Sequence, residues 1–205
     1  MADSIECLNK EFDINRETVT LNIRAVMKME LEEYIWAIED FSLIINNDST
    51  NYTAYYNRAE AYSMSGMNQE ALEDYSKSIK LNPNYASAIL NRGFLYMDME
   101  DYSKAIIDFE NSIELNQIEF EKAYALNNIG YCLYKLGKLD DSQNYIENSI
   151  NLYPINSFAY RNLALVHIAL KNKELACENI LKSIELGFVS SYGTEILELQ
   201  KINCE

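Results

Sequence analysis

Residues 52–85 read YTAYYNRAEAYSMSGMNQEALEDYSKSIKLNPNY, and this stretch decides the fold. Tyr55, Ala59 and Tyr62 are spaced four and three residues apart, so they fall on one face of a helix. This spacing predicts a first helix over about residues 53–65.

A second helix is expected after a tight turn. Gly66 suits the left-handed backbone conformation that ends a helix. The next apolar stripe, whose clearest members are Ala71 and Tyr75, predicts a helix over about residues 68–81. Pro83 stops this helix, because the residue before a proline disfavours helical backbone angles. The stretch is therefore a helix–turn–helix unit.

The same unit recurs along the chain, marked by small residues at intervals of 34, 34, 37 and 34. The first series is Ala25, Ala59, Gly93, Gly130 and Ala164, and a second, twelve residues later, is Ala37, Ala71, Ala105, Ser142 and Ala176. This period predicts stacked repeats rather than a globular fold with one centre. Glycine within a helix costs roughly 0.5–1 kcal/mol against alanine, so Gly93 and Gly130 predict close contacts between helices.

This pattern resembles the tetratricopeptide repeat, whose motif places an aromatic, a small residue, a tyrosine, an alanine, an aromatic and a proline at set offsets. The second repeat carries them as Tyr55, Ala59, Tyr62, Ala71, Tyr75 and Pro83. The resemblance implies an all-α fold, a right-handed α-α superhelix (solenoid) of about five repeats. We expect these repeats at residues 18–51, 52–85, 86–122, 123–156 and 157–187.

The two ends of the array are expected to differ from the repeats. Residues 188–205 are predicted to contain a C-terminal capping helix, from about Tyr192 to Asn203, with Tyr192, Ile196, Leu199 and Ile202 on one face. Residues 1–17 are expected to form an N-terminal segment or cap. Three extra residues within 117–122 are expected to lengthen the first helix of the fourth repeat or the loop before it.

Composition narrows the range of partners. The formal net charge is −15 and the pI is near 4.5, which disfavours nucleic acid and anionic membrane surfaces because both need a basic protein surface. No run of apolar residues is long enough to span a membrane, and no secretory signal is visible. The four cysteines are scattered without paired spacing, so we expect reduced thiols in a cytoplasmic protein.

Motifs of catalysis and of metal or cofactor binding are absent from the sequence. The single histidine, His167, stands where other repeats place Tyr62, Tyr96 and Leu133, so it is expected to be a packed side chain. The sequence therefore predicts a protein that is not an enzyme and uses no cofactor or metal.

The resemblance implies a concave groove lined by the first helix of each repeat, where a peptide or a partner helix binds. Laid on this chain, the pattern gives Tyr56, Glu60, Met64, Leu90, Phe94, Met97, Asp98, Tyr124, Asn127, Tyr131, Tyr134, Lys135, Phe158 and Arg161. Two interpretations remain open. The aromatic side chains anchor a ligand whose direction is set by acidic Glu60 and Asp98 and by basic Lys135 and Arg161, or they fill a narrow superhelix.

The groove hypothesis predicts a scaffold or adaptor that binds an apolar or mildly basic protein segment. The carboxylate clamp that some family members use for acidic chaperone tails is not expected, because the matching cation positions hold no lysine or arginine and a buried carboxylate would go unpaired. The alternatives are a self-associating structural protein and the regulatory subunit of a separately encoded enzyme.

Overall fold

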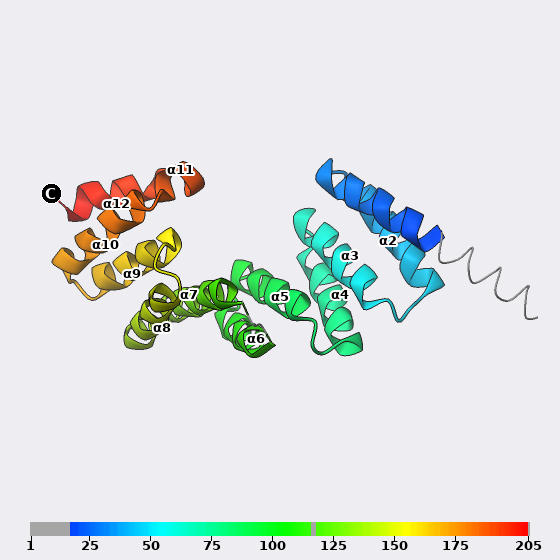
Figure 1. Ribbon diagram of the computed structural model, residues 1–205, viewed down its shortest axis with the longest axis horizontal. Coiled ribbons are helices and arrows are strands. Elements are labelled where there is room, and N and C mark those ends of the chain that lie inside the picture. Colours follow the sequence, from blue (N-terminus) through cyan, green and yellow to red (C-terminus); the bar gives the residue numbers. More distant parts are fainter. Residues whose placement is uncertain (1–16, 116–117, 205) are drawn as a thin grey trace, which may run out of the picture. The chain divides into compact units, whose positions relative to one another are not determined.

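A computed structural model describes residues 17–115 and 118–204, and every regular element within these ranges is a helix (Figure 1). The helices are residues 17–30, α2 Tyr34–Asn47, α3 Tyr52–Met64, α4 Asn68–Leu81, α5 Ala86–Asp98, α6 Tyr102–Leu115, α7 Glu119–Lys135, α8 Leu139–Leu152, α9 Ser157–Ala169, α10 Lys173–Glu185, α11 Phe188–Tyr192 and α12 Glu195–Asn203. The all-α class predicted from the sequence is confirmed. The N-terminal cap predicted over residues 1–17 lies almost entirely outside the described residues.

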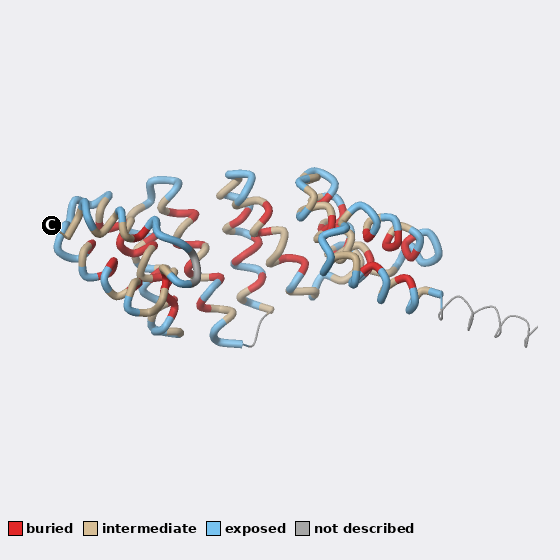
Figure 2. Tube along the Cα trace, turned by 90° about the horizontal axis from the view of Figure 1, so that it is seen from above, coloured by how far each residue is buried: buried red, intermediate tan, exposed pale blue. Residues whose placement is uncertain are grey.

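Contacts divide the chain into two compact units, Met1–Leu95 and Tyr96–Glu205. In the first unit α3 contacts α2 and α4. In the second, α7 contacts α6, α8 and α9, and α10 contacts α9, α11 and α12. Each helix therefore packs on its near neighbours in sequence. The buried residues lie where neighbouring helices face one another (Figure 2).

One turn geometry recurs after five helices of the described chain. A residue with a positive φ stands at the same position of each unit, namely Glu32, Gly66, Glu100, Gly137 and Lys171, with φ between 59° and 80°. The next amide closes the turn, as where Met67 N–H donates to the carbonyl of Tyr62 at 2.8 Å. Glycine adopts this conformation without steric cost, whereas glutamate and lysine do not.

Close helix contacts occur where the small residues predicted them. Ala59 and Ala71 are fully buried. At Gly130, an added Cβ would lie 2.4 Å from Cγ1 of Ile146, so a side chain there would force Ile146 or the backbone of α8 to move. The hydroxyl of Ser142 donates to the carbonyl of Gly130 at 2.7 Å. The tight contact expected at Gly130 is confirmed.

A serine near the end of three second helices returns to the start of the preceding first helix. Ser149 donates to the carbonyl of Ala123 at 2.7 Å, and the same bond joins Ser78 to Tyr52 and Ser183 to Ser157. These serines are buried, so each bond satisfies a hydroxyl that would otherwise be costly to bury.

The fourth pair has a longer first helix than the others. Helix α7 has 17 residues, whereas α3, α5 and α9 have 13 each. Its N-terminus at Glu119 falls within the stretch that holds the three extra residues. Of the two expected outcomes, the insertion lengthens the helix.

The C-terminal cap differs from the prediction of one helix. Gly193, with φ 101°, separates α11 from α12, because only glycine tolerates that backbone angle well. Within α12, residues six positions apart lie about 120° apart around the helix, so Ile196 and Ile202 face different ways. Ile196 is fully buried, whereas Ile202, predicted on the same face, is 72% exposed.

The cysteine prediction was wrong for one pair. Cys177 in α10 and Cys204 after α12 form a disulfide, with their Cα atoms 5.1 Å apart. Sequence spacing did not reveal it, because only the packing of α12 on α10 brings the two residues together. Cys132 is a free buried thiol as expected, and burial raises its pKa to about 12. Cys7 lies outside the described residues.

Candidate functional site

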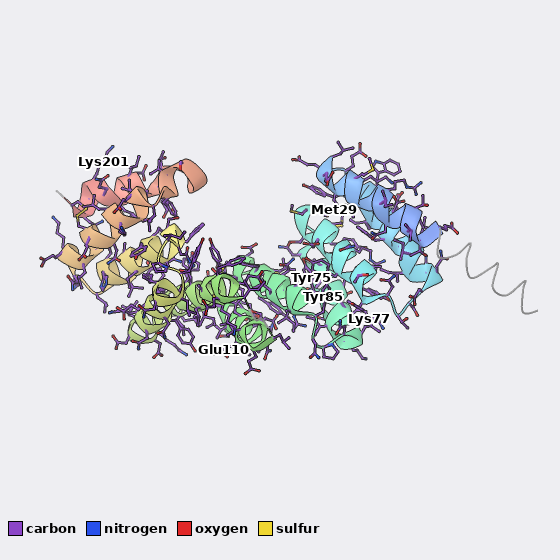
Figure 3. The ribbon with its side chains drawn as sticks, viewed as in Figure 1. Met29, Tyr75, Lys77, Tyr85, Glu110 and Lys201 are labelled. Carbon is purple, nitrogen blue, oxygen red and sulfur yellow. A yellow bond between two sulfur atoms is a disulfide. The ribbon has the colours of Figure 1, made fainter. Side chains whose placement is uncertain are left out.

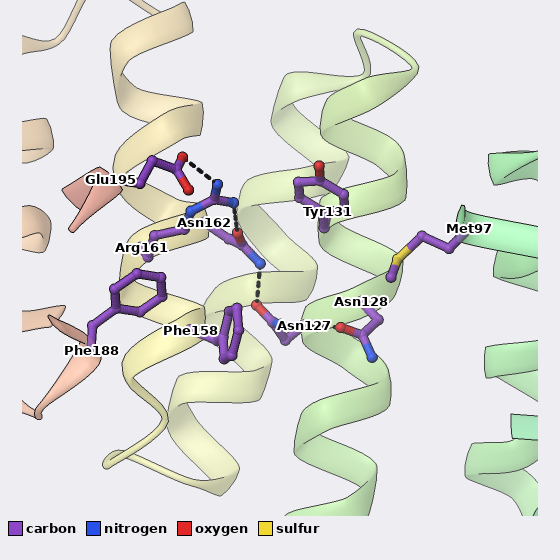
Figure 4. A pocket seen from close by; sticks show the side chains of 9 residues that line it. All are labelled: Met97, Asn127, Asn128, Tyr131, Phe158, Arg161, Asn162, Phe188 and Glu195. Carbon is purple, nitrogen blue, oxygen red and sulfur yellow. Dashed lines mark hydrogen bonds and ion pairs between the residues drawn. The ribbon is translucent and has the colours of Figure 1, made fainter. Parts of the chain in front are cut away.

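The second unit contains a cavity of about 340 Å³ between α7, α9 and the C-terminal helices (Figure 4). Its walls combine aromatic rings, amides and one ion pair. The lining residues are Met97, Asn127, Asn128, Tyr131, Phe158, Arg161, Asn162, Phe188 and Glu195. A concave surface of this mixed character suits a ligand that has one apolar group and several polar ones.

Aromatic side chains form the apolar part of the cavity. Phe158 of α9 meets Phe188 of α11 edge to face, with ring centroids 5.3 Å apart. Gly187, with φ 86°, turns the chain after α10 and so places Phe188 against α9. Tyr131 of α7 lies under the guanidinium of Arg161, whose carbon is 5.9 Å from the ring centroid. The rings are therefore held by packing before any ligand binds.

A chain of amides forms the polar part. Asn162 donates to the side-chain oxygen of Asn127 at 2.9 Å, and Asn127 donates to that of Asn128 at 3.4 Å. Arg161 Nη1 donates to Asn162 Oδ1 at 2.8 Å, which fixes the orientation of the first amide. Asn127 and Asn162 are buried, whereas Asn128 is half-buried. These hydrogen bonds therefore fix the three amides in series, beginning at Arg161 and ending at Asn128.

The electrostatic centre of the cavity is an ion pair. Arg161 Nη2 lies 2.6 Å from Oε1 of Glu195, the first residue of α12. The side chain of Arg161 is 15% exposed and that of Glu195 is 57% exposed. Arg161 was predicted as a basic residue of the groove, and the structure adds that α12, expected only as a cap, supplies its counter-charge.

The cavity brings together five of the predicted groove residues, Met97, Asn127, Tyr131, Phe158 and Arg161. Four other lining residues, Asn128, Asn162, Phe188 and Glu195, were not predicted from the sequence. Asn128 and Asn162 had a signal, since asparagine recurs there with the repeat period. Phe188 and Glu195 had none, because they follow the last repeat and their placement depends on the turns at Gly187 and Gly193.

Four predicted residues of the second unit do not line this cavity. Tyr124 is exposed and packs on Phe120 and Tyr153, with ring centroids 6.4 and 6.0 Å away. Tyr134 packs against the buried cluster around Ile146. Lys135 lies over the ring of Tyr102, and Asp98 is exposed.

In the first unit, the predicted residues Tyr56 and Glu60 belong to an internal cluster. Tyr75 and Tyr85, both labelled in Figure 3, contact Tyr56 with ring centroids 6.0 and 5.1 Å away. Asn91 Nδ2 donates to Glu60 Oε1 at 3.1 Å and to the hydroxyl of Tyr56 at 3.0 Å. Burial raises the pKa of Glu60, and the hydrogen bonds from Tyr56 and Asn91 oppose that shift.

The other predicted residues of the first unit are Met64, Leu90 and Phe94. Met64 is 64% exposed, and Leu90 and Phe94 are half-buried. A cavity of about 440 Å³ in this unit lies elsewhere, against helix 17–30 and α3, and Asn22, Asn57 and Tyr85 contribute to its wall. Of the groove residues that the repeat pattern gives, Asn22 of the first repeat lines this cavity, and Tyr56, Glu60, Met64, Leu90 and Phe94 do not.

Comparison with known proteins identifies the repeats. Sequence profiles of the tetratricopeptide repeat match residues 52–85, 86–118 and 123–156. This chain belongs to the tetratricopeptide repeat proteins. Proteins built from tetratricopeptide repeats generally mediate interactions between proteins.

Two curated proteins are similar to this chain in sequence. DnaJ homolog subfamily C member 3 of Gallus gallus is 31% identical over 117 residues, which are 57% of this chain and 22% of that protein. Mitochondrial import receptor subunit TOM70 of Mus musculus is 24% identical over 205 residues, 96% of this chain and 33% of that protein. The chain therefore spans a third or less of the length of these two relatives.

Solved tetratricopeptide repeat structures share the fold. YrrB, described as a TPR protein with an unusual peptide-binding site, has a TM-score of 0.74 and 21% identity, covering 94% of this chain and 97% of that one. MamA from Desulfovibrio magneticus RS-1 has a TM-score of 0.76 and 16% identity, covering 85% and 97%. At these identities the likeness concerns the fold alone.

Proposed function

We propose that this tetratricopeptide repeat protein is a non-enzymatic adaptor that holds a segment of a partner protein in the cavity of its second unit. The observation that carries the proposal is the concave wall where Tyr131, Phe158 and Phe188 meet the amide chain. Whole small-molecule sites span roughly 300–1,000 Å³. The cavity, at about 340 Å³, lies at the low end of that range, so it suits one large side chain and its flanking backbone.

The chemistry of the wall supports an apolar anchor on the partner. Met97 and the three aromatic rings supply contact area, and methionine adapts its shape to different side chains. The half-buried amide of Asn128 stands next to this surface and suits a backbone carbonyl or amide of the bound segment. We therefore expect an aromatic or long aliphatic side chain within an extended or helical segment.

A basic group on the partner remains part of the proposal at Glu60. Its carboxylate is half-buried, and it accepts hydrogen bonds from two neutral groups, Asn91 and Tyr56. A lysine or arginine of a ligand would offset the cost of burying that charge. Glu60 belongs to the first unit, so its contribution is tested separately from that of the cavity.

Selection of peptides from a random display library tests the proposal. Purified wild-type protein should enrich a consensus with one aromatic or long aliphatic position. Tyr131→Ala should weaken binding of the enriched peptide by about 2 kcal/mol if the tyrosine is an anchor. Tyr145→Ala, on the second helix α8, is the matched control and should leave binding unchanged. Equal binding of the peptide by both variants would show that the cavity is not the binding site.

Self-association is a second candidate, favoured by the surface of the first repeat. Met27 of the first repeat is 58% exposed. The equivalent residue of the second repeat, Ala61, is fully buried. Ile23 and Trp36 are also more than half exposed. Exposed apolar groups of this kind mark contact surfaces. Sedimentation velocity over a range of concentrations tests this candidate, and a constant monomer mass that Met27→Asp leaves unchanged would exclude it.

The cellular location predicted from the sequence is cytoplasmic and stays a prediction. No helix in the described part of the chain is long and apolar enough to cross a membrane. The disulfide between Cys177 and Cys204 argues against a reducing compartment, where such bonds are rare.

A further inference from the structure

Arginines of this protein hold carboxylates in two different ways. Arg58 donates from Nε and from Nη2 to the two oxygens of Asp74, at 2.6 and 2.9 Å. Arg24 uses the same two nitrogens toward the two oxygens of Asp40. This paired geometry is the strongest way in which a guanidinium binds a carboxylate.

In the cavity, Arg161 donates to its carboxylate from only one of the two nitrogens, Nε and Nη2, that Arg58 and Arg24 use. Its Nη2 donates to a single oxygen of Glu195, and its Nη1 donates to Asn162. Its Nε is buried and has no hydrogen-bond partner among the described residues. A buried donor without a partner carries a free-energy penalty, so this guanidinium is incompletely satisfied.

The guanidinium is nevertheless held ready for a better acceptor. Asn162 fixes Nη1, and the ring of Tyr131 lies under the guanidinium carbon. Glu195, by contrast, is more than half exposed and begins α12 immediately after the turn at Gly193. An exposed carboxylate of this kind can rotate into water and remain hydrated. The side chain of Arg161 is 15% exposed and lies at the cavity wall together with Glu195 (Figure 4).

We propose that the bound segment carries a carboxylate that replaces Glu195 and accepts hydrogen bonds from both Nε and Nη2 of Arg161. This inference rests on the proposed function, because it specifies the ligand of the same cavity. The ligand class is a peptide with an aromatic or aliphatic side chain next to a carboxylate, which differs from the apolar or mildly basic segment that the sequence predicted. Glu195 is then an internal substitute for that carboxylate, and binding exchanges one counter-charge for another.

Three small probes test the exchange and distinguish the two sources of a carboxylate in a peptide. N-acetylphenylalanine offers a terminal carboxylate, N-acetyl-aspartyl-phenylalaninamide offers a side-chain carboxylate, and N-acetylphenylalaninamide offers none. Binding is followed by NMR through the Nε–H signal of Arg161, which is assigned by its loss in Arg161→Lys. The Nε–H should shift when it gains an acceptor.

Glu195→Gln removes the internal competitor and should bind at least one acidic probe about tenfold more tightly than the wild type does. The neutral probe should change less than twofold. Glu198→Gln, on the same helix, is the matched control and should behave as the wild type. Arg161→Lys combined with Glu195→Gln should lose the gain, because lysine keeps the charge but lacks the paired donors.

An equal gain for the neutral probe, or no gain for either acidic probe, would overturn the proposal. So would a gain that leaves the Nε–H signal in place. If Tyr131→Ala abolishes binding of all probes while Glu195→Gln does not favour the acids, the cavity remains the binding site and only the carboxylate exchange fails. If no probe binds to any variant, the exchange fails and the display selection still decides the proposed function.

Discussion

The hydroxyl of Ser142 in α8 donates to the backbone carbonyl of Gly130 in α7 at 2.7 Å, so the two helices touch where neither carries a bulky side chain. Contacts of this kind set the spacing within each helix pair. The spacing in turn decides where the side chains of α7 and α9 point, and so it shapes the cavity.

Gly130→Ala should destabilise the protein by about 1–3 kcal/mol, because the new Cβ would lie 2.4 Å from Ile146 Cγ1 and force the helices apart. Helix propensity alone predicts the opposite sign, a gain of roughly 0.5–1 kcal/mol. Urea unfolding monitored by circular dichroism measures the difference. A more stable variant would show that the contact is looser than the structure has it.

Glu100→Gly should stabilise the protein by about 0.5–1 kcal/mol. Glu100 has φ 61° at the position that Gly66 and Gly137 occupy in other repeats, and a residue with a side chain pays about 1–2 kcal/mol for that conformation. Part of the gain is lost to the greater freedom of glycine in the unfolded chain. Glu110→Gly, within α6, is the control and should cost about 1 kcal/mol in the same unfolding experiment. A loss of stability in both variants would contradict the turn geometry.

His167→Leu should remove a pH dependence of stability. Burial lowers the pKa of His167, while Glu147 and Glu178 act in the opposite direction. The unfolded chain therefore takes up the proton first, and wild-type stability should fall as the pH drops through about 6.5 toward the lower pKa of the folded state. The chain has one histidine, which makes the comparison clean.

His167→Leu introduces the residue that the fourth repeat has at this position, Leu133. Nδ1 of His167 is buried without a hydrogen-bond partner among the described residues. The variant should therefore also raise the free energy of unfolding by about 1 kcal/mol near neutral pH. Free energies of unfolding between pH 7.5 and 5.5 supply the measurement. Parallel curves for the two proteins would mean that His167 titrates equally in both states.

Reduction of the disulfide between Cys177 and Cys204 should loosen the C-terminal cap. The bond closes a loop of 27 residues in sequence, for which the chain-entropy model gives about 3–4 kcal/mol. Hydrogen exchange followed by mass spectrometry should show faster exchange over residues 188–204 after treatment with a dithiol. The double variant Cys177→Ser/Cys204→Ser should exchange fast with and without the dithiol. Two free thiols in the untreated protein would contradict the bond.

The sequence predicted the repeats well because each repeat is a local structure. Spacing of 34 residues, small residues at helix contacts and Gly66 at a turn all act over short distances, and each appears in the structure as expected. The three extra residues before the fourth repeat also pointed to the longer α7.

The sequence failed where distant segments meet. Glu195 pairs with Arg161 across 34 residues, and Cys177 reaches Cys204 across 27, because α11 and α12 fold back on α9 and α10. No motif marks these residues, and their partners depend on turns at Gly187 and Gly193. The aromatic residues posed a different problem, since an aromatic on a first helix lines the cavity at Tyr131 but belongs to an internal cluster at Tyr56.

The most direct test of binding in the cavity follows the methyl groups of the methionines by NMR while a display-selected peptide is added. Met97 lines the cavity, whereas Met64 is exposed on the first unit and is the internal control. If the peptide binds in the cavity, the signal of Met97 should shift saturably, Tyr131→Ala should abolish that shift, and the signal of Met64 should stay unchanged. A peptide that binds at full strength and leaves Met97 unchanged would contradict the claim that the cavity is the binding site.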